Sequence, residues 1–422
     1  MSDGGGARPL LVRDLAQVAT PATGGAPLRG RQLGAVDVVV NAYVLCEGGR
    51  ITSFGRMRDL AAPEGEVEEL DGSGLSAVPG LVDCHTHACF AGDRVDEFEL
   101  RARGAGYEEL HAAGGGILAT VRATRAAGEE ALTGAVRRHR QWMRRAGTTT
   151  FEAKSGYGLD RETELASLRA IRTAGGIPTW LGAHAVPPEF EDADAYLDFA
   201  LAEVLPEAVR LAVAADVFVE TGAFDAAQAR RYLEACREAG LALRLHGDQF
   251  TEQGAVGLAV ELDARSIDHL EATGPDGVQA LGASEVVGVL LPTSALFLDR
   301  PMPPARALVD AGAAIALATD FNPGSAFSES LGIVASLAAT QLHLSPAEAL
   351  SACTVNAAHV LGRSNEVGRI APGYAADLVL LDAPDWRYLS YHLGVGLVAG
   401  VVEAGELFTS RDAGNAESAA LG

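Results

Sequence analysis

Lysine is almost absent from this chain, and the positive charge that marks nucleic-acid-binding proteins is lacking as well. The 422 residues carry 33 basic and 56 acidic side chains, for a net charge of −23, and Lys154 is the single lysine. A negative field of this size repels phosphate backbones, which argues against a nucleic-acid partner. An anionic substrate would therefore need locally placed cations, and the isolated Lys154 becomes a candidate for a position that requires a lysine.

The sequence also shows no paired cysteine motif and no pattern that predicts a leader segment or a membrane span. The five cysteines form no Cys-x-x-Cys motif, which argues against a disulfide framework and favours a reducing compartment. No basic N-terminal region precedes an apolar stretch, and the longest apolar run, residues 393–402, is too short to span a bilayer. The hydrophobic fraction of 48% supports a large buried core. We therefore expect a globular cytoplasmic protein with no membrane contact.

The order of β and helical patterns predicts an α/β fold of the (β/α)8, TIM-like barrel type. Short apolar runs alternate with amphipathic helical stretches such as residues 129–145 and 226–239. Eight such units in series match a closed barrel better than a doubly wound sheet, which is the alternative fold. The expected strands are residues 81–84, 148–154, 179–183, 215–220, 242–246, 266–269, 286–291 and 314–319.

The two ends of the chain are predicted to build a second, smaller β-sandwich domain. Residues 38–44 and 51–54 indicate a β-hairpin around Gly48 and Gly49, whereas the first 30 residues show little pattern. Three further β runs follow residue 365, and we expect them to pair with the N-terminal ones. The predicted boundaries are 1–79 and 365–410 for the β domain, 80–364 for the barrel, and 411–422 for a disordered tail.

Histidines gather at the predicted carboxyl ends of the strands, where barrel enzymes place their catalytic groups. The first strand ends in His85-Thr86-His87, and its two imidazoles share one face because strand residues alternate. A lone His-x-His pair is more often structural, but five of the ten histidines and one aspartate occupy such ends, which favours a metal site. These residues are His85, His87, His184, His246, His269 and Asp320.

The donor set predicts one divalent or trivalent metal ion per chain, zinc or iron. We expect His85, His87 and His246 as nitrogen ligands, with Asp320 near or on the metal. Such an ion lowers the pKa of a bound water from roughly 15.7 to about 7. Asp320 can accept the proton of that water, and His269 can stabilise a developing oxyanion or carry a proton. A single ion is favoured because the fourth expected strand lacks a lysine, the residue that, when modified, bridges the two ions in some barrels with two metals.

Two stretches, residues 79–87 (Pro-Gly-Leu-Val-Asp-Cys-His-Thr-His) and 368–379, resemble the amidohydrolase superfamily. More specific motifs, including residues 154–159, 182–188 and 318–325, resemble the imidazolonepropionase family, and the similarity runs from about residue 35 to 410. The resemblance implies hydrolysis of the cyclic amide C–N bond of 4-imidazolone-5-propanoate, a small anion, to N-formimidoyl-L-glutamate in L-histidine degradation. It leaves the oligomeric state open, with a homodimer as one expectation.

The resemblance also implies a set of substrate-binding residues around the predicted metal. A guanidinium fork fits a carboxylate, and a tyrosine hydroxyl can donate a hydrogen bond. Arg94 would pair with the substrate carboxylate, and Tyr157 would donate a hydrogen bond to the substrate or product. His184 would contact the ring. The product or ring edge would be held by Asn322, Gly324 and Ser325.

Gln249 departs from the family pattern, which often has a carboxylate three residues after His246. A glutamine can hydrogen-bond the imidazolone ring but cannot take a proton, so we expect proton transfer to fall to Asp320 and His269. The same residue counts against the main alternative, a deaminase of a heterocycle, because such relatives use a glutamate there. A third hypothesis, a non-catalytic binding protein on a retained barrel, is disfavoured by the intact set of candidate ligands.

Overall fold

The computed structural model describes residues 8–63, 65–104 and 115–409, and it confirms the predicted barrel. Eight strands form one sheet in sequence order, and the pairs from the second strand to the eighth are parallel. The predicted strand ends agree with the observed ones to within a residue or two. The strands are β6 (Leu81–Asp83), β7 (Thr148–Lys154), β8 (Ile177–Ala183), β9 (Ala214–Val219), β10 (Ala242–Gly247), β11 (Ser266–His269), β12 (Val287–Leu290) and β13 (Ala314–Leu317).

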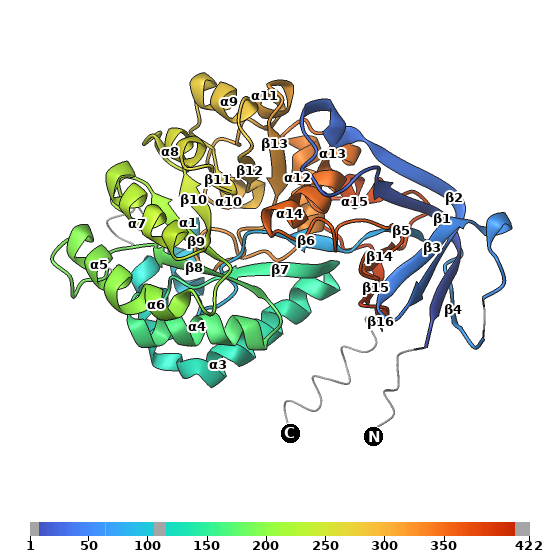
Figure 1. The fold of residues 1–422 in the computed structure, drawn as a ribbon, viewed down its shortest axis with the longest axis horizontal. Helices are drawn as coiled ribbons and strands as arrows, with labels where there is room; N and C mark the ends of the chain where they lie inside the picture. The colour runs from blue at the N-terminus through green and yellow to red at the C-terminus, as the bar shows by residue number, and fades with distance from the viewer. Residues whose placement is uncertain (1–7, 64, 105–114, 410–422) are drawn as a thin grey trace. The chain divides into compact units, whose positions relative to one another are not determined.

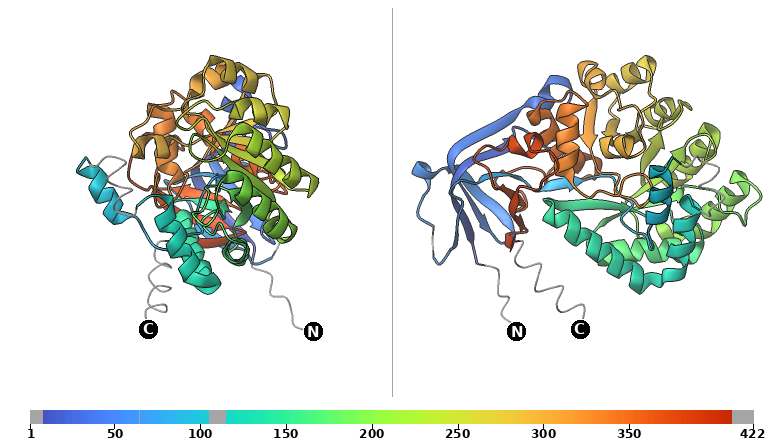
Figure 2. Two further views of the ribbon diagram at one scale, coloured as in Figure 1. Left: turned by 90° about the vertical axis from the view of Figure 1, so that its left-hand side faces the viewer. Right: turned by 180° about the vertical axis from the view of Figure 1, so that it is seen from behind.

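Helices lie outside these strands, as Figure 1 and Figure 2 show. Side-chain caps begin several of them; α7 starts at a capping box in which Asp225 and Gln228 satisfy each other's backbone N–H groups. The predicted start at Glu129 matches a break inside α3, where Gly128 has a φ of 71°. The helices are α1 (Val95–Ala102), α3 (Ile117–Arg145), α4 (Arg161–Thr173), α5 (Ala193–Phe199), α6 (Leu205–Ala208), α7 (Ala226–Glu238), α8 (Ala255–Glu261), α9 (Pro275–Gly282), α10 (Pro292–Phe297) and α11 (Ala305–Asp310).

The ring is completed by backbone contacts between the segments that follow its first and last strands. The N–H of Asp320 donates to the carbonyl of His85 at 3.1 Å, and the N–H of His87 donates to the carbonyl of Phe321 at 2.9 Å. Thr86 and Phe321 form an isolated parallel bridge. This register brings the two histidines after β6 beside the aspartate after β13, although Asp320 lies 233 positions after His87 in the sequence.

The strands from the two chain ends form a separate sheet, which confirms the predicted small β domain. Its order is β16-β15-β14-β5-β1-β2-β3, with β4 paired to β1, so that β14 joins the C-terminal strands to the N-terminal ones through β5. The predicted hairpin is β2–β3, whose last pair is Glu47 with Arg50 around Gly48 and Gly49. The strands are β1 (Leu10–Pro21), β2 (Val36–Glu47), β3 (Arg50–Arg56), β4 (Glu68–Asp71), β5 (Ser76–Pro79), β14 (Leu378–Leu381), β15 (Val398–Glu403) and β16 (Glu406–Thr409).

Strand β1 corrects the expectation that the first 30 residues carry little pattern. Its register with β2 shifts between Val12 and Leu15, and Asp14 in this irregular stretch has a φ of 56°. An extra residue of this kind changes which side chains face the core, so apolar alternation is interrupted in mid-strand. The strand was missed because its period-2 signal changes phase.

Contacts divide the chain into two compact units, each with its own core. One comprises Met1–Asp83, Trp142–Thr150 and Ser330–Gly422, and the other comprises Cys84–Gln141 and Phe151–Glu329. The first unit also contains α12 (Leu331–Thr340), α13 (Pro346–Ala352), α14 (Val355–Val360) and α15 (Tyr388–Tyr391). The predicted tail, residues 411–422, lies outside the described residues. Within the described ranges, no helix is both long and apolar enough to cross a membrane.

Candidate metal centre and active site

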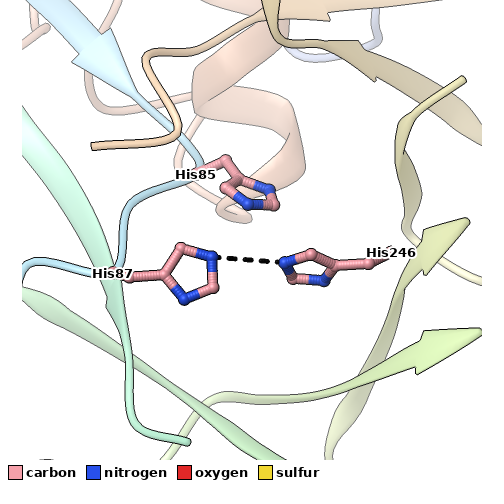
Figure 3. A group of neighbouring side chains, drawn as sticks. All are labelled: His85, His87 and His246. Carbon is pink, nitrogen blue, oxygen red and sulfur yellow. Dashed lines mark hydrogen bonds between the residues drawn. The ribbon is translucent and has the colours of Figure 1, made fainter. Parts of the chain in front are cut away.

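Three imidazoles converge at the carboxyl ends of the barrel strands (Figure 3). His85 and His87 stand on the segment after β6 and His246 on β10, and one ring nitrogen from each lies within 4.8 Å of the others. The Nε2 atoms of His87 and His246 are 3.3 Å apart. Asp320 Oδ1 lies 3.5 Å from Nε2 of both His85 and His87. The structure therefore brings together the four residues that were predicted from the sequence to form the metal site.

Carboxylates behind the rings determine which nitrogens face the centre. Nδ1 of His85 lies 2.6 Å from Asp268 Oδ2, and Nδ1 of His246 lies 3.0 Å from Asp216 Oδ1. Because a carboxylate accepts, each Nδ1 carries the proton and each Nε2 directs a lone pair towards the centre. Burial, followed by the charge of Lys154, holds the pKa of His85 well below its ordinary value, which keeps the ring neutral.

This donor set fits a bound metal ion. Nε2 of His85 and Nε2 of His87 each lie 3.5 Å from Oδ1 of Asp320, and buried lone pairs gathered this closely repel one another unless a cation lies between them. Neutral imidazoles with a carboxylate are ligands that zinc and iron accept. The same atoms would be a poor arrangement for a site without a cation.

His269 stands at the end of β11, with its ring centroid 5.7 Å from that of His85 and 5.4 Å from that of His246. It forms a second potential ligand group with His85 and Asp320, again within 4.8 Å, and its Nδ1 is 3.5 Å from Glu271 Oε1. Burial lowers the pKa of His269, but the charges of Glu271, Asp320 and Asp268 outweigh burial, so that the net effect raises it. A histidine that keeps its proton here can donate to a developing oxyanion or relay a proton.

Non-glycine residues with left-handed backbone conformations recur at these strand ends. The φ angles are 53° for Asp248, 87° for His269 and 55° for Asp320. Each such conformation costs on the order of 1–3 kcal/mol and persists only where the surrounding structure holds it. Two candidate catalytic residues, His269 and Asp320, are therefore held in conformations that the surrounding structure must stabilise.

The loop after β7 is held by a buried carboxylate that the sequence did not nominate. Glu164 Oε1 accepts hydrogen bonds from the N–H groups of Gly156, Gly158 and Leu159, at 2.9, 2.8 and 3.0 Å. These bonds fix the loop that carries Tyr157. A glutamate a few residues after a Gly-containing segment was the available signal, but only the fold shows that the two meet and that Glu164 is buried.

Tyr157 and His184, two of the residues predicted to contact the substrate, lie beside His87. The His184 ring stacks on His87 with centroids 5.2 Å apart, and its Nδ1 lies 2.9 Å from the carbonyl of Gly156. The Tyr157 ring is 5.3 Å from His184 and 5.9 Å from His87. Burial, followed by the charge of Asp320, raises the pKa of Tyr157, so its hydroxyl remains a hydrogen-bond donor.

The loop after β13 is stabilised from within by Asn322. Its Oδ1 accepts from the N–H groups of Gly324 and Ser325 at 2.8 and 2.7 Å, and its Nδ2 donates to the Asp320 carbonyl at 2.6 Å. The Ser325 hydroxyl donates to Asp320 Oδ2 at 3.3 Å. In this structure Asn322 shapes the loop and contacts the backbone carbonyl of Asp320, while the Ser325 hydroxyl contacts the Asp320 carboxylate.

Two guanidiniums flank that loop. Arg94 pairs with Glu97 through two contacts, one of which joins Nε to Oε2 at 2.9 Å. A side chain at position 324 would meet the Arg94 guanidinium and would have to displace it. Arg101, which the sequence did not nominate, donates from Nη2 to the Gly324 carbonyl at 2.9 Å, and its guanidinium lies 5.1 Å from the centroid of the Phe297 ring.

Gln249 follows β10 in a partly exposed position. The backbone just after it is held by hydrogen bonds to the Glu220 carboxylate. Glu220 Oε2 accepts from the N–H groups of Phe250 and Thr251 at 2.9 and 3.1 Å. Gln249 thus stands at the rim of the strand ends, while His246, three residues earlier, points into the centre.

A (β/α)8 barrel with imidazoles and a carboxylate at its strand ends defines a metal-dependent hydrolase of the amidohydrolase class. Residues 76–408 match the model of the Amidohydrolase family. An imidazolonepropionase from Rubrobacter xylanophilus is 61% identical, covering 94% of this chain and 98% of the relative. An imidazolonepropionase from Chloroflexus aggregans is 44% identical, covering 96% and 99%. The chain belongs to the amidohydrolase family and, within it, to the imidazolonepropionases.

Solved structures of more distant proteins share the architecture. A zinc-bound adenosine deaminase from Xanthomonas campestris aligns with a TM-score of 0.68 and 19% identity, covering 94% of this chain and 92% of that one. A triazine hydrolase variant aligns with a TM-score of 0.70 and 16% identity, covering 97% and 99%. At these identities the likeness concerns the fold alone.

Proposed function

We propose that this chain hydrolyses the cyclic amide C–N bond of 4-imidazolone-5-propanoate to N-formimidoyl-L-glutamate, a step of L-histidine degradation. The observation that carries the proposal is the convergence of His85, His87, His246 and Asp320 at the strand ends of a chain whose near relatives are named imidazolonepropionase. A small anionic substrate suits this site, because Arg94 and Arg101 bring positive charge to an otherwise acidic protein.

We infer that His85, His87 and His246 hold one zinc or iron ion, with Asp320 near or on it. When bound, such an ion lowers the pKa of a water molecule from roughly 15.7 to about 7. Burial raises the pKa of Asp320, which makes its carboxylate a better proton acceptor. The Ser325 hydroxyl holds Oδ2 of that carboxylate at 3.3 Å and so orients it.

The remaining steps fall to side chains around Asp320. The water oxygen bonds to the ring carbonyl carbon while Asp320 takes a proton from it, and Asp320 passes that proton to the departing ring nitrogen as the C–N bond breaks. His269 donates to the carbonyl oxygen where negative charge develops. Gln249 binds the ring by hydrogen bonds and transfers no proton.

Substrate orientation falls to residues on the loops after β6, β7 and β8. Arg94 pairs with the propanoate carboxylate, Tyr157 donates a hydrogen bond, and His184 contacts the ring. Ordering the substrate between them aligns the amide with the attacking water. We place this reaction in the cytoplasm, where small metabolites are degraded, and a homodimer is the proposed assembly.

Turnover of 4-imidazolone-5-propanoate by purified, metal-replete protein tests the proposal. The loss of the ring's ultraviolet absorbance and the appearance of N-formimidoyl-L-glutamate would be followed, with bound metal measured on the same sample. We expect turnover that disappears in His85→Ala and after treatment with a chelator. Intact substrate in the presence of fully loaded protein would overturn the proposal, and ammonia release from aminated heterocycles would favour a deaminase instead.

A further inference from the structure

Five charged side chains lie beneath the ligand imidazoles, inside the barrel, where strands are ordinarily apolar. Each is at most 1% exposed, and together they contain two cations and three carboxylates. We call them the charge cluster; its members are Glu152, Lys154, Asp216, Arg244 and Asp268. Charges this deeply buried are costly unless each is paired, so their arrangement requires an explanation.

The first arm of the cluster runs from Lys154 to His246. Lys154 Nζ forms an ion pair with Asp216 Oδ2 at 2.8 Å. The other oxygen of Asp216 accepts from Nδ1 of His246 at 3.0 Å. The lysine therefore holds the carboxylate that fixes the orientation and the protonated nitrogen of one ligand.

The second arm reaches the backbone between the other two ligands. Lys154 Nζ donates to Glu152 Oε1 at 2.8 Å, and Glu152 Oε2 accepts from the N–H of Thr86 at 3.0 Å. Thr86 also donates from its hydroxyl to the Glu152 carbonyl at 2.6 Å. Since Thr86 separates His85 from His87, this arm fixes the backbone from which both rings project.

The third arm ends at His85. Asp268 Oδ2 lies 2.6 Å from Nδ1 of His85, 2.9 Å from Arg244 Nη2 and 4.0 Å from Lys154 Nζ. Arg244 Nη1 donates to Glu152 Oε1 at 3.0 Å and so connects this arm to the second. The planar guanidinium bridges two carboxylates, while the compact ammonium fits among three.

We propose that Lys154 is a positioning residue for the metal centre, which explains why the chain's only lysine is found here. Through Asp216, Glu152 and Asp268 it keeps the ligand rings oriented with Nε2 towards the centre, and its ammonium contacts neither metal nor substrate. The proposal rests on the metal ligands of the proposed function. It adds that metal affinity depends on a side chain one carboxylate away from the ligands.

The test measures metal binding directly, in three variants of the full-length protein. Lys154→Met removes the charge and keeps the length of the side chain, and Lys154→Arg keeps the charge but not its compact shape. Glu164→Gln is the matched control, because it removes another fully buried charge that contacts loop N–H groups rather than ligand carboxylates. Cobalt(II) affinity by chelator competition, the visible spectrum of the cobalt-loaded protein, kcat and KM would be compared.

We expect Lys154→Met to bind cobalt about 10–100-fold more weakly, with an altered cobalt spectrum and a lower kcat at nearly unchanged KM. Lys154→Arg should recover part of the affinity, and Glu164→Gln should keep the affinity and spectrum of the natural protein. Wild-type affinity and spectrum in a folded Lys154→Met would overturn the proposal, even if the variant were less stable.

The experiment also covers a Lys154→Met variant that does not fold and a natural protein that binds metal but is inactive. If Lys154→Met does not fold, Asp216→Asn cuts the first arm alone, and unchanged cobalt affinity in that variant would overturn the proposal. The metal readouts need no substrate. A natural protein that binds cobalt but leaves 4-imidazolone-5-propanoate intact would therefore contradict the proposed function without deciding the role of Lys154.

Discussion

The two sheets of this molecule differ in the polar side chains that they bury. The terminal sheet packs a wholly apolar cluster that includes Leu15, Val44 and Leu378, whereas the barrel encloses the charge cluster beneath its imidazoles. Burying apolar surface stabilises a fold by roughly 25 cal/mol per Å2, while each buried ion costs several kcal/mol before pairing. Both units bury apolar side chains that contribute stability, and the charge cluster gives the barrel a second, polar interior beside the candidate site.

The charge cluster can be compared with the apolar residues that could fill the same volume, in terms of the stability that each would give. Well-packed hydrophobic residues of similar volume often match or exceed the stability of a buried ion pair. The charge cluster therefore has little to offer as a stabilising core, and its contacts with the ring nitrogens of His85 and His246 account for its presence. The comparison predicts that substitutions in the two interiors will change different measurements.

The largest effect is expected from Asp320→Asn in the barrel. The amide cannot accept the proton of the attacking water, so kcat should fall by about 100-fold to 10,000-fold. Thermal unfolding should change little, because a buried carboxylate is replaced by a neutral group of the same shape. Steady-state kinetics and a melting curve would check both. Ser325→Ala, which removes only the hydroxyl that orients Asp320, is the milder control, and full activity in Asp320→Asn would refute the assignment.

Leu378→Ala in the terminal sheet should give the reverse result. Leu378 is fully buried in the apolar cluster, and truncating such a residue lowers the free energy of unfolding by about 2–5 kcal/mol. Urea unfolding would measure this loss, while kcat should stay at its natural value. Val40→Ala, at a position 49% exposed on β2, should change stability by less than about 0.5 kcal/mol. A large loss of kcat in folded Leu378→Ala would break the division between the two interiors.

Sequence alone predicted the parts of the site that depend on local pattern. Strand ends could be read from apolar runs, and the carboxyl ends of parallel strands meet at one face of a barrel, so His85, His246 and Asp320 could be brought together before any coordinates. The same reasoning failed for β1, where the irregularity at Asp14 shifts the alternation.

The charge cluster could not be predicted as a unit, because its contacts depend on register between strands. Arg244 lies opposite Asp216 on one side and Ser266 on the other, and His246 lies opposite Asp268. A shift of one residue would turn these side chains out of the barrel. The available signal was charge inside strands that should be apolar, and only Lys154 drew attention, through its rarity.

The smallest effect is expected from His139, a titratable group packed outside the metal centre. It is 3% exposed, donates from Nδ1 to the Ala88 carbonyl at 2.8 Å, and stacks on Phe90. Burial lowers the pKa of His139 from 6.5 to about 4. Between these values the unfolded chain binds a proton that the native chain does not, so stability falls as the pH falls through this window.

This pH dependence should weaken when His139 is replaced by glutamine, which keeps an N–H donor but does not titrate. The difference in unfolding free energy between pH 7 and pH 5 should shrink by about 2 kcal/mol, as measured by urea unfolding at both values. His343→Asn, at an exposed position with a φ of 56° that asparagine tolerates, should keep the full acid sensitivity. Identical pH dependence in the natural protein and His139→Gln would contradict this prediction, because it would show that His139 binds its proton equally well in the native and unfolded chains. The acid sensitivity would then arise from other groups, such as the charge cluster.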